Sequence, residues 1–341
     1  APLTVTLKAE AHQIEEVVVT ALGIKRSEKA LSYNVQKVGG ESLTTVKNPN
    51  FMNSLSGKVA GVNINASSAG MGGAARIVMR GPKSITRSNQ ALYVIDGVPV
   101  NNTSQGEISG GAFSSQPGSE GIADINPEDI ESISVLSGPA AAALYGSAAA
   151  QGVIMITTKK GKEGRVKVDI DASVAASMYA HKMDVLNARE YGQVMWQAYV
   201  NDGMDPNTNG LGYRYDWGYN AQGNPVLNAV TMRKYLDAAG TTPAADTDWF
   251  DETTRTGVVQ NYNVAVSSGS DRHASYFSLG YYKNLGIIKS SDFDRYSARM
   301  NTEYKLIKDV LTIGEHFTLN RTSEVQAPGG FLENVLQFNP S

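Results

Sequence analysis

One polar segment has the residue types and the spacing of a calcium-binding loop. Asp205, Asn207 and Asn209 alternate, Gly210 follows them, and Asp216 stands at the twelfth position. Alternating oxygen ligands around a glycine turn can wrap one cation, and a carboxylate at the twelfth position closes the shell. Because Asp replaces the usual bidentate Glu there, such a site would bind calcium weakly. The other interpretation is a polar external loop built from Asp-Pro and Asn-Gly turns.

Four aromatic side chains alternate directly after this segment, at Tyr213, Tyr215, Trp217 and Tyr219. In an outer loop they could stack on sugars or on peptide side chains. They could equally belong to an aromatic girdle at a membrane interface. The sequence leaves both interpretations open and assigns no residue to substrate binding.

Three features of the sequence partly match catalytic or nucleotide-binding motifs, but none of these motifs is complete. The four histidines, at positions 12, 181, 273 and 316, lack the mutual spacing and the neighbouring carboxylates of a metal or acid–base motif. Ser147 has no nucleophile-elbow frame, because Tyr145 occupies a position that needs glycine. The Gly57-Lys58 pair is followed by Val59 instead of Ser or Thr, so it is not a phosphate-binding loop. We therefore expect that the chain is not an enzyme.

Composition narrows the class of protein further. A net charge of -3 with 18% charged residues does not provide the basic face that nucleic-acid binding needs. The absence of cysteine excludes disulfides and thiolate metal sites. No segment approaches the roughly 20 consecutive apolar residues of a membrane-spanning helix. The first residues, 1–8, read as the last strand of something upstream, so we expect a piece of a longer polypeptide.

Residues 27–164 mix short helices and strands and are rich in Gly, Ala and Ser. Apolar residues at a spacing of four predict an amphipathic helix over residues 49–59. Asp96-Gly97 predicts a hairpin turn, and Pro139 to Gly146 predicts a short helix with proline in its first turn. Residues 130–136 and 153–158 read as buried strands.

From residue 165 onward the pattern is mostly one of alternating strands with polar loops. The alternation is clearest in residues 165–178 and 295–306, and weaker in 258–268, 274–283 and 309–320, where Glu315 interrupts the apolar face. Short turns between them indicate an antiparallel meander. A soluble sandwich would bury the apolar face in its own core, whereas a membrane barrel would point it at lipid. Periodicity alone leaves both architectures open.

An ordered series of motifs resembles the SusC/RagA branch of the TonB-dependent receptors. The matching segments are Glu15–Gly23, Leu55–Val62, Arg80-Gly81, Tyr93–Pro99, Ile125–Ile133, Gly138–Ser147, Gly152–Lys159, Asp248–Asp251 and Gln260–Val264. The resemblance implies an α+β plug domain followed by antiparallel transmembrane strands of a β-barrel with roughly 22 strands. We accordingly expect residues 1–14 to end an upstream domain, 15–26 to form a TonB box and linker, 27–164 the plug, and 165–341 the first barrel strands. The barrel would continue beyond Ser341, because 177 residues supply only a handful of strands.

The same resemblance implies a function and a set of partners. The TonB-binding segment would comprise Glu15, Glu16, Val17, Val18, Val19, Thr20 and Ala21. Its β-branched residues favour an extended backbone that can add to the sheet edge of a partner. The family implies a multi-pass location in the outer membrane of a Gram-negative bacterium, a SusD-like surface lipoprotein as a lid, and import of an oligosaccharide or, as second choice, an oligopeptide. The alternative from a different class is a soluble or surface-attached β-rich binding or adhesion module.

Overall fold

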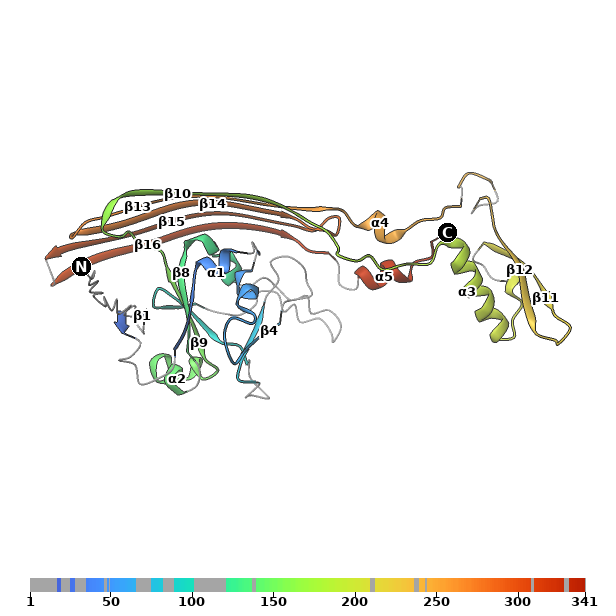
Figure 1. Cartoon of the computed structure of the whole chain (residues 1–341), viewed down its shortest axis with the longest axis horizontal. Helices are drawn as coiled ribbons and strands as arrows, with labels where there is room; N and C mark the ends of the chain where they lie inside the picture. The colour runs from blue at the N-terminus through green and yellow to red at the C-terminus, as the bar shows by residue number, and fades with distance from the viewer. Residues whose placement is uncertain are drawn as a thin grey trace, which may run out of the picture. The chain divides into compact units, whose positions relative to one another are not determined.

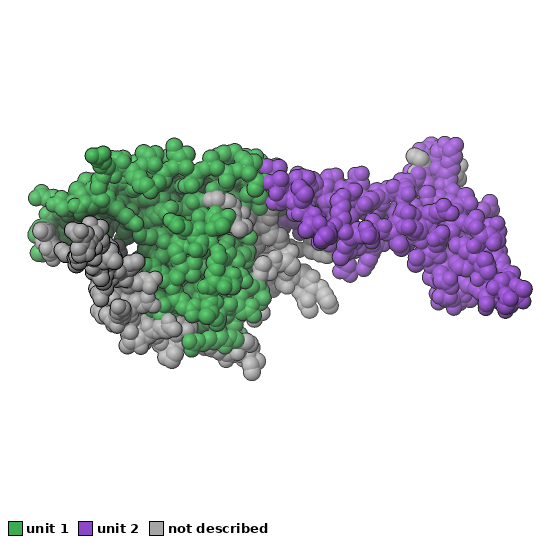
Figure 2. Space-filling model, viewed as in Figure 1, with its two compact units in different colours: residues 1–175, 259–284, 292–325 green, residues 176–258, 285–291, 326–341 purple. Residues whose placement is uncertain are grey.

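The computed structural model describes residues 17–19, 25–27, 35–45, 48, 50–65, 75–81, 89–100, 121–136, 139–208, 212–235, 239–242, 244–307, 310–327 and 331–340. The chain forms two compact units (Figure 2). The first contains residues 1–175, 259–284 and 292–325, and the second contains 176–258, 285–291 and 326–341. Within the part of the chain that is described, no helix is both long and apolar enough to cross a membrane.

A mixed five-stranded sheet in the order β3-β8-β9-β6-β7 organises the N-terminal half of the first unit. Its strands are β3 (Val35–Gly39), β6 (Leu92–Ile95), β7 (Val98–Val100), β8 (Ile130–Leu136) and β9 (Val153–Thr158). Strand β9 pairs in parallel with β6 and antiparallel with β8. Along β9, Ile154 and Ile156 enter one buried cluster, whereas Val153 and Met155 enter another on the opposite face. Covering both faces explains why β9 reads as a continuous apolar run in the sequence.

The remaining elements of this half of the unit are short. They are β1 (Val17–Val19), β2 (Lys25–Ser27), α1 (Glu41–Thr44), η3 (Phe51–Leu55), β4 (Val62–Asn65), β5 (Arg76–Met79), η4 (Gly121–Asp124), η5 (Pro127–Asp129), α2 (Pro139–Tyr145) and η6 (Gly146–Ala149). Residues of α1, η3, β5 and η4 enter the buried cluster on one face of the sheet, and residues of α2 and η6 enter the cluster on the other. The predicted hairpin at Asp96-Gly97 is confirmed as the β6–β7 turn, with φ values of 48° and 91°. Positive φ at both central residues is what a two-residue hairpin turn requires.

The helix predicted over residues 49–59 is wrong in type and length. The structure has the 3-10 helix η3 over Phe51–Leu55 only, capped by Asn50, whose side chain accepts a hydrogen bond from the Met52 amide. Ser56, with a ψ of 127°, leaves the helical path, and Gly57, with a φ of 76°, completes a turn in which the Lys58 amide donates to the Leu55 carbonyl oxygen. The burial pattern nevertheless agrees with the prediction, since Phe51, Leu55 and Val59 are all in the core.

A second five-stranded sheet, in the order β10-β13-β14-β15-β16, completes the first unit. Its strands are β10 (Gly164–Ser177), β13 (Gly257–Gly269), β14 (His273–Leu285), β15 (Asp292–Ile307) and β16 (Leu311–Val325). These strands form a curved layer over the first sheet, β3-β8-β9-β6-β7 (Figure 1). Residues 270–272 and 308–310 connect neighbouring strands at one end of the sheet, whereas residues 178–256 connect β10 to β13 at the other. The predicted meander is therefore present, with one long excursion after β10.

The second unit contains that excursion. Its elements are α3 (Ala188–Asn201), η7 (Pro206–Thr208), β11 (Tyr213–Tyr219), β12 (Pro225–Met232), α4 (Trp249–Thr253) and α5 (Phe331–Gln337). Helix α3 packs on the β11–β12 hairpin, and Gly192 permits the close approach, because a Cβ there would lie 2.8 Å from ring atoms of Tyr213. Mostly strands were expected here, and α3 was not predicted. A capping box between Asn187 and Glu190 begins this helix and was a readable signal.

Gly152 provides a test of how tightly the plug is packed. A Cβ there would lie 2.2 Å from Met79 Sδ and 3.1 Å from the Leu136 carbonyl oxygen, at a φ of 117°. Gly57 also has positive φ, at 76°, but no atom lies within 4 Å of the added carbon. We expect Gly152→Ala to destabilise β9 by about 3 kcal/mol and Gly57→Ala by about 1 kcal/mol. Hydrogen exchange of the β9 amides in the intact protein measures both, and equal effects would contradict the packing described here.

Candidate functional site

The inner face of the second sheet is polar although the plug covers it. Its buried residues include Asn261, Asn263, Ser278, Arg295, Ser297, Arg299 and Asn301. These residues alternate with exposed apolar residues on the other face, as the sequence predicted for β15. Buried polar groups are costly unless they are hydrogen-bonded, so the plug has to supply partners for them.

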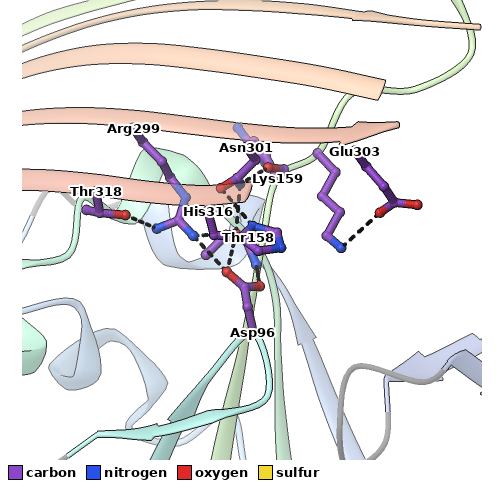
Figure 3. Close-up of polar contacts among 9 residues, drawn as sticks. Asp96, Thr158, Lys159, Arg299, Asn301, Glu303, His316 and Thr318 are labelled. Atoms are coloured by element: carbon purple, nitrogen blue, oxygen red, sulfur yellow. Dashed lines mark hydrogen bonds and ion pairs between the residues drawn. The ribbon is translucent and has the colours of Figure 1, made fainter. Parts of the chain in front are cut away.

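An ion pair between Asp96 and Arg299 joins the plug to this inner face. The Arg299 Nη2 atom lies 2.7 Å from Asp96 Oδ2, and the side chains are only 4% and 9% exposed. Asp96 projects from the β6–β7 turn, and Arg299 comes from the middle of β15 (Figure 3). The tight turn at Asp96-Gly97 thus places a carboxylate at the tip of the plug sheet.

Thr158, the last residue of β9, completes the hydrogen bonding of this pair. Its hydroxyl donates to Asp96 Oδ2 at 2.6 Å and accepts from Arg299 Nη2 at 2.7 Å and from Asn301 Nδ2 at 3.1 Å. Its amide donates to Asp96 Oδ1 at 2.9 Å. A hydroxyl offers one proton and two lone pairs, so every hydrogen-bonding position of Thr158 Oγ1 is used.

Asn301 extends the network along the sheet. Its Nδ2 also donates to the Lys159 carbonyl oxygen at 2.7 Å, and its Oδ1 lies 3.0 Å from His316 Nδ1 (Figure 3). Because the amide nitrogen is occupied by two acceptors on the plug, the amide oxygen is left to accept from the imidazole. The plug–sheet contact at this point therefore involves the end of β9, which Lys159 follows, and the neighbouring strands β15 and β16 of the second sheet.

A second polar contact lies at the start of β8. Asp129 Oδ1 accepts hydrogen bonds from the Ser278 hydroxyl at 2.6 Å and the Tyr276 hydroxyl at 2.9 Å, both from β14. Asn126 Nδ2 donates to Asn263 Oδ1 at 2.9 Å. Burial raises the pKa of the Asp129 carboxyl, and the two hydroxyl donors oppose that rise.

Gly280 lets the plug approach this part of the sheet. A Cβ at Gly280 would lie 2.5 Å from Asn126 Nδ2 and 2.6 Å from Ser297 Oγ. A side chain at this inward position of β14 would therefore displace the plug. The sequence did not predict this contact: Asp96 was singled out only as part of a hairpin turn, and Gly280 was not singled out at all. Alternation places Arg299 on the polar face but does not say what covers it.

The predicted TonB-binding segment is described in part. Strand β1 (Val17–Val19) pairs antiparallel with β2 (Lys25–Ser27), with Val18 opposite Arg26. Glu15, Glu16, Thr20 and Ala21 lie outside the described residues. The extended backbone expected for the three valines is confirmed.

The residues of the predicted calcium loop make contacts of their own. Asn207 bridges the loop to β11, accepting from the Tyr215 amide at 2.8 Å and donating to the Tyr215 carbonyl oxygen at 3.0 Å. Asp205 Oδ1 accepts from the Asn207 amide, and Asp216 Oδ1 lies 3.5 Å from Asn228 Nδ2. Asn209 is outside the described residues. In the part of the chain that is described, no three His, Cys, Asp or Glu side chains are grouped as metal ligands. The calcium site stays a prediction.

The aromatic run divides between a core and a surface. Tyr213 and Tyr215 are buried against Trp196 of α3, whereas Tyr219 is 70% exposed. Burial raises the pKa of Tyr215 to about 12, which keeps this phenol neutral. The strand that carries these residues, β11, pairs with β12 alone among the described strands. The inner two tyrosines therefore hold the hairpin to α3.

Known proteins resemble the chain in sequence and in structure. Residues 27–153 match the family model of the TonB-dependent receptor plug domain. The chain is 33% identical over its whole length to the TonB-dependent receptor SusC of Bacteroides thetaiotaomicron, of which it spans 30%. It is 28% identical over 93% of its length to the TonB-dependent receptor P39 of Formosa agariphila, of which it spans 26%.

Solved structures give the same result. The RagAB peptide importer in its open-open state matches 92% of this chain and 33% of its own, at a TM-score of 0.70 and 25% identity. The closed-closed state gives a TM-score of 0.67 at 25% identity, over 88% and 32% of the respective chains. The chain thus has the plug domain and part of the β-barrel of a TonB-dependent receptor. Within that class it is SusC/RagA-like, and it spans about a third of the length of these relatives.

The buried ion pair leads to a prediction about plug attachment. Arg299→Met leaves the Asp96 charge buried without its partner, and we expect it to weaken plug attachment by about 3–5 kcal/mol. Adding Asp96→Asn to Arg299→Met should restore part of that loss, because no lone charge remains. Pulse proteolysis of the plug across a urea series, on the full-length receptor in detergent, measures the attachment.

The neighbouring pair between Lys160 and Glu303 serves as the control. Its atoms are 3.6 Å apart, but the side chains are 39% and 38% exposed. Water and salt screen such a pair, so Lys160→Met should cost less than about 1 kcal/mol. An equal loss for both single substitutions would contradict the assignment of the buried pair as the main attachment.

The calcium prediction is tested by titration calorimetry. If the loop binds calcium, titration of the full-length receptor should give a saturable heat that Asp205→Asn removes. Weak binding in the millimolar range is expected, because few of the ligands are charged. Identical traces for the two proteins would remove the site.

Proposed function

We propose that this chain is the plug and part of the barrel of an importer that carries oligomeric nutrients across an outer membrane with energy delivered through TonB. The observation that carries the proposal is the polar character of the plug–sheet contact. Among the described residues, neither apolar core of the plug includes a residue of β10 or β13–β16. The plug can therefore move relative to the second sheet, which we call the barrel wall, without exposing its apolar cores to water. The polar groups released by such a movement can form hydrogen bonds with water instead.

The N-terminal strand is the proposed point at which force enters. In this proposal Glu15–Ala21 binds TonB by strand addition, in which main-chain hydrogen bonds carry the affinity. The supporting observation is that Val17–Val19 is extended and that, among the described residues, it pairs with β2 over three residues. A pairing of that length is marginal on its own, so exchange for a longer partner strand is energetically accessible.

The outer face of the second sheet supports a location in a bilayer. Its exposed apolar residues include Val166, Val168, Ile170, Val264, Phe277, Leu279, Phe317 and Leu319. On β15, Tyr296 and Tyr304 flank the outward residues Ala298, Met300 and Thr302. Eight residues of strand span about 27 Å along the strand, which is about 20 Å of height at the usual tilt of about 40° and so fits within the apolar band, about 25 Å tall, of outer-membrane barrels. We propose the outer membrane of a Gram-negative bacterium as the location, which sets aside the soluble module.

Cargo and further partners follow from the relatives. RagAB is described as a peptide importer, which supports an oligopeptide, and the SusC-like sequence supports the oligosaccharide that the family resemblance implies. We propose oligosaccharide as the first candidate and oligopeptide as the second. A SusD-like surface lipoprotein is the proposed lid. No catalytic role is proposed.

Deletion of residues 15–21 tests the function. We expect the deletion to abolish uptake of a labelled oligosaccharide or oligopeptide by whole cells, because force no longer reaches the plug. The amount of folded receptor in the outer membrane, measured by its heat-dependent gel mobility, should be unchanged. Uptake that continues at the original rate would sink the proposal.

Two further arms make the result specific. Replacing Lys25–Ser27 by alanines keeps residues 15–21 and changes only the side chains of their pairing partner, so uptake should be retained. Offering both cargo types to the unaltered protein decides between them, since only one should compete with the labelled compound.

A further inference from the structure

The outer face of the second sheet contains an apolar groove of about 450 Å³. Four neighbouring strands, β13 to β16, contribute to it. Its principal side chains are those of Tyr262, Leu279, Tyr281, Tyr296, Ala298 and Leu319. All of them project away from the plug, since the alternate residues of the same strands are the ones that the plug buries.

Side-chain size accounts for the groove. Ala298 carries only a methyl group between the larger outward residues Tyr296 and Met300, and Leu319 lies opposite it in the β15–β16 register. Tyr262 and Tyr281 stack with ring centroids 6.3 Å apart, and Tyr281 and Tyr296 are 4.9 Å apart. The three tyrosines thus form an aromatic row across three strands, and the apolar groove lies beside it.

Arg321 lies beside this row. It is opposite Tyr296 in the register, lines the groove and is exposed. Its side chain makes no hydrogen bond or ion pair with any residue in the described part of the chain. The neighbouring acidic side chain, Asp294, faces Lys283 at 4.0 Å and interacts with the Tyr281 hydroxyl. Charge on this part of the face is therefore balanced except at Arg321.

The row lies toward the end of the sheet that carries the long connections. Residues 178–256 and 286–291 leave the sheet at that end, and the three-residue connections from β13 to β14 and from β15 to β16 are at the other. In outer-membrane barrels the long loops face the cell surface. Tyrosine rings prefer the depth of lipid headgroups, and the apolar residues below them meet the acyl chains.

We infer that this groove binds an acidic lipid of the outer leaflet, with an acyl chain in the groove and a phosphate on Arg321. A guanidinium pairs with phosphate through two parallel hydrogen bonds, and the headgroup region is where that phosphate lies. The apolar floor at Ala298 accepts a chain but offers nothing to a sugar or a peptide backbone. A bound lipid phosphate would supply the counter-charge for Arg321 that no described residue provides. The inference uses the membrane location proposed above and is independent of the cargo.

Native mass spectrometry of the full-length receptor tests the site. The protein in detergent is titrated with dioleoylphosphatidylglycerol or with the zwitterionic dioleoylphosphatidylcholine. Unaltered protein should prefer the acidic lipid, and Arg321→Gln should lower its affinity for that lipid about fivefold while leaving the zwitterionic lipid unchanged. Ala298→Leu, which fills the groove but keeps the face apolar, should weaken both lipids.

Arg214→Gln is the matched control. Arg214 is also an exposed arginine without a hydrogen bond or ion pair among the described residues, but it lies on β11, outside the sheet. Its substitution should leave both affinities unchanged, and heat-dependent gel mobility confirms that every variant is folded. Retention of the acidic preference in Arg321→Gln overturns the inference. So does a dimer that Ala298→Leu dissociates with no change in lipid binding, since the occupant is then a second copy. Neither result bears on uptake, which the deletion of residues 15–21 tests separately.

Discussion

The buried pair of Asp96 and Arg299 is the constraint on which the rest of the plug–wall contact depends. Two charges removed from water cost several kcal/mol each, and their attraction offsets this only when the remaining hydrogen-bonding positions are filled. Thr158 supplies partners from the plug side, and Thr318 accepts from the Arg299 Nη1 atom on the barrel side, so both terminal nitrogens of the guanidinium are bonded. The Arg299 Nε atom is buried without a partner among the described residues. The pair therefore fixes the position of β15 against the end of β9. A shift of the plug by one residue along the sheet would leave two charges without partners.

Different interactions hold the plug together and fix its position on the second sheet. The plug coheres through apolar clusters that belong to it alone, whereas its place on the wall is set by polar contacts at Asp96, Asn126 and Asp129. Removing water from apolar surface stabilises a contact at any register, but hydrogen bonds and ion pairs stabilise only one. A domain that has to be held in one position and also released is suited by this division, because the polar contacts can be exchanged for water.

More of the fold than of the candidate site could be predicted from the sequence. Local signals sufficed for the turn at Asp96-Gly97, for α2 and for the long strands, and motif order identified the plug. The prediction of an α-helix over residues 49–59 was wrong because Ser56 and Gly57 turn the chain after five helical residues. The same apolar spacing also fits a short 3-10 helix that buries Phe51 and Leu55. Helix α3 was not predicted, despite its capping box, because the alternating pattern of the surrounding segments favoured strands throughout this part of the chain. The partners of Arg299 on the plug, Asp96 and Thr158, could not be predicted, since they lie more than 140 residues away along the chain.

Three arginines of the second sheet have different surroundings, because their positions along the strands place them on different faces or beside different residues. Arg295 is inward on β15, is 1% exposed and lies over the rings of Tyr282 and Phe293, at 5.4 Å and 6.0 Å. Arg299, four residues on, shares that face and meets the plug. Arg321 is outward, because the register sets it opposite Tyr296.

The alternation of polar and apolar residues alone did not distinguish a sandwich from a barrel, because both have one apolar face. The inverted burial decides between them: the polar face is the covered one and the apolar face is the exposed one, which water does not tolerate and lipid does.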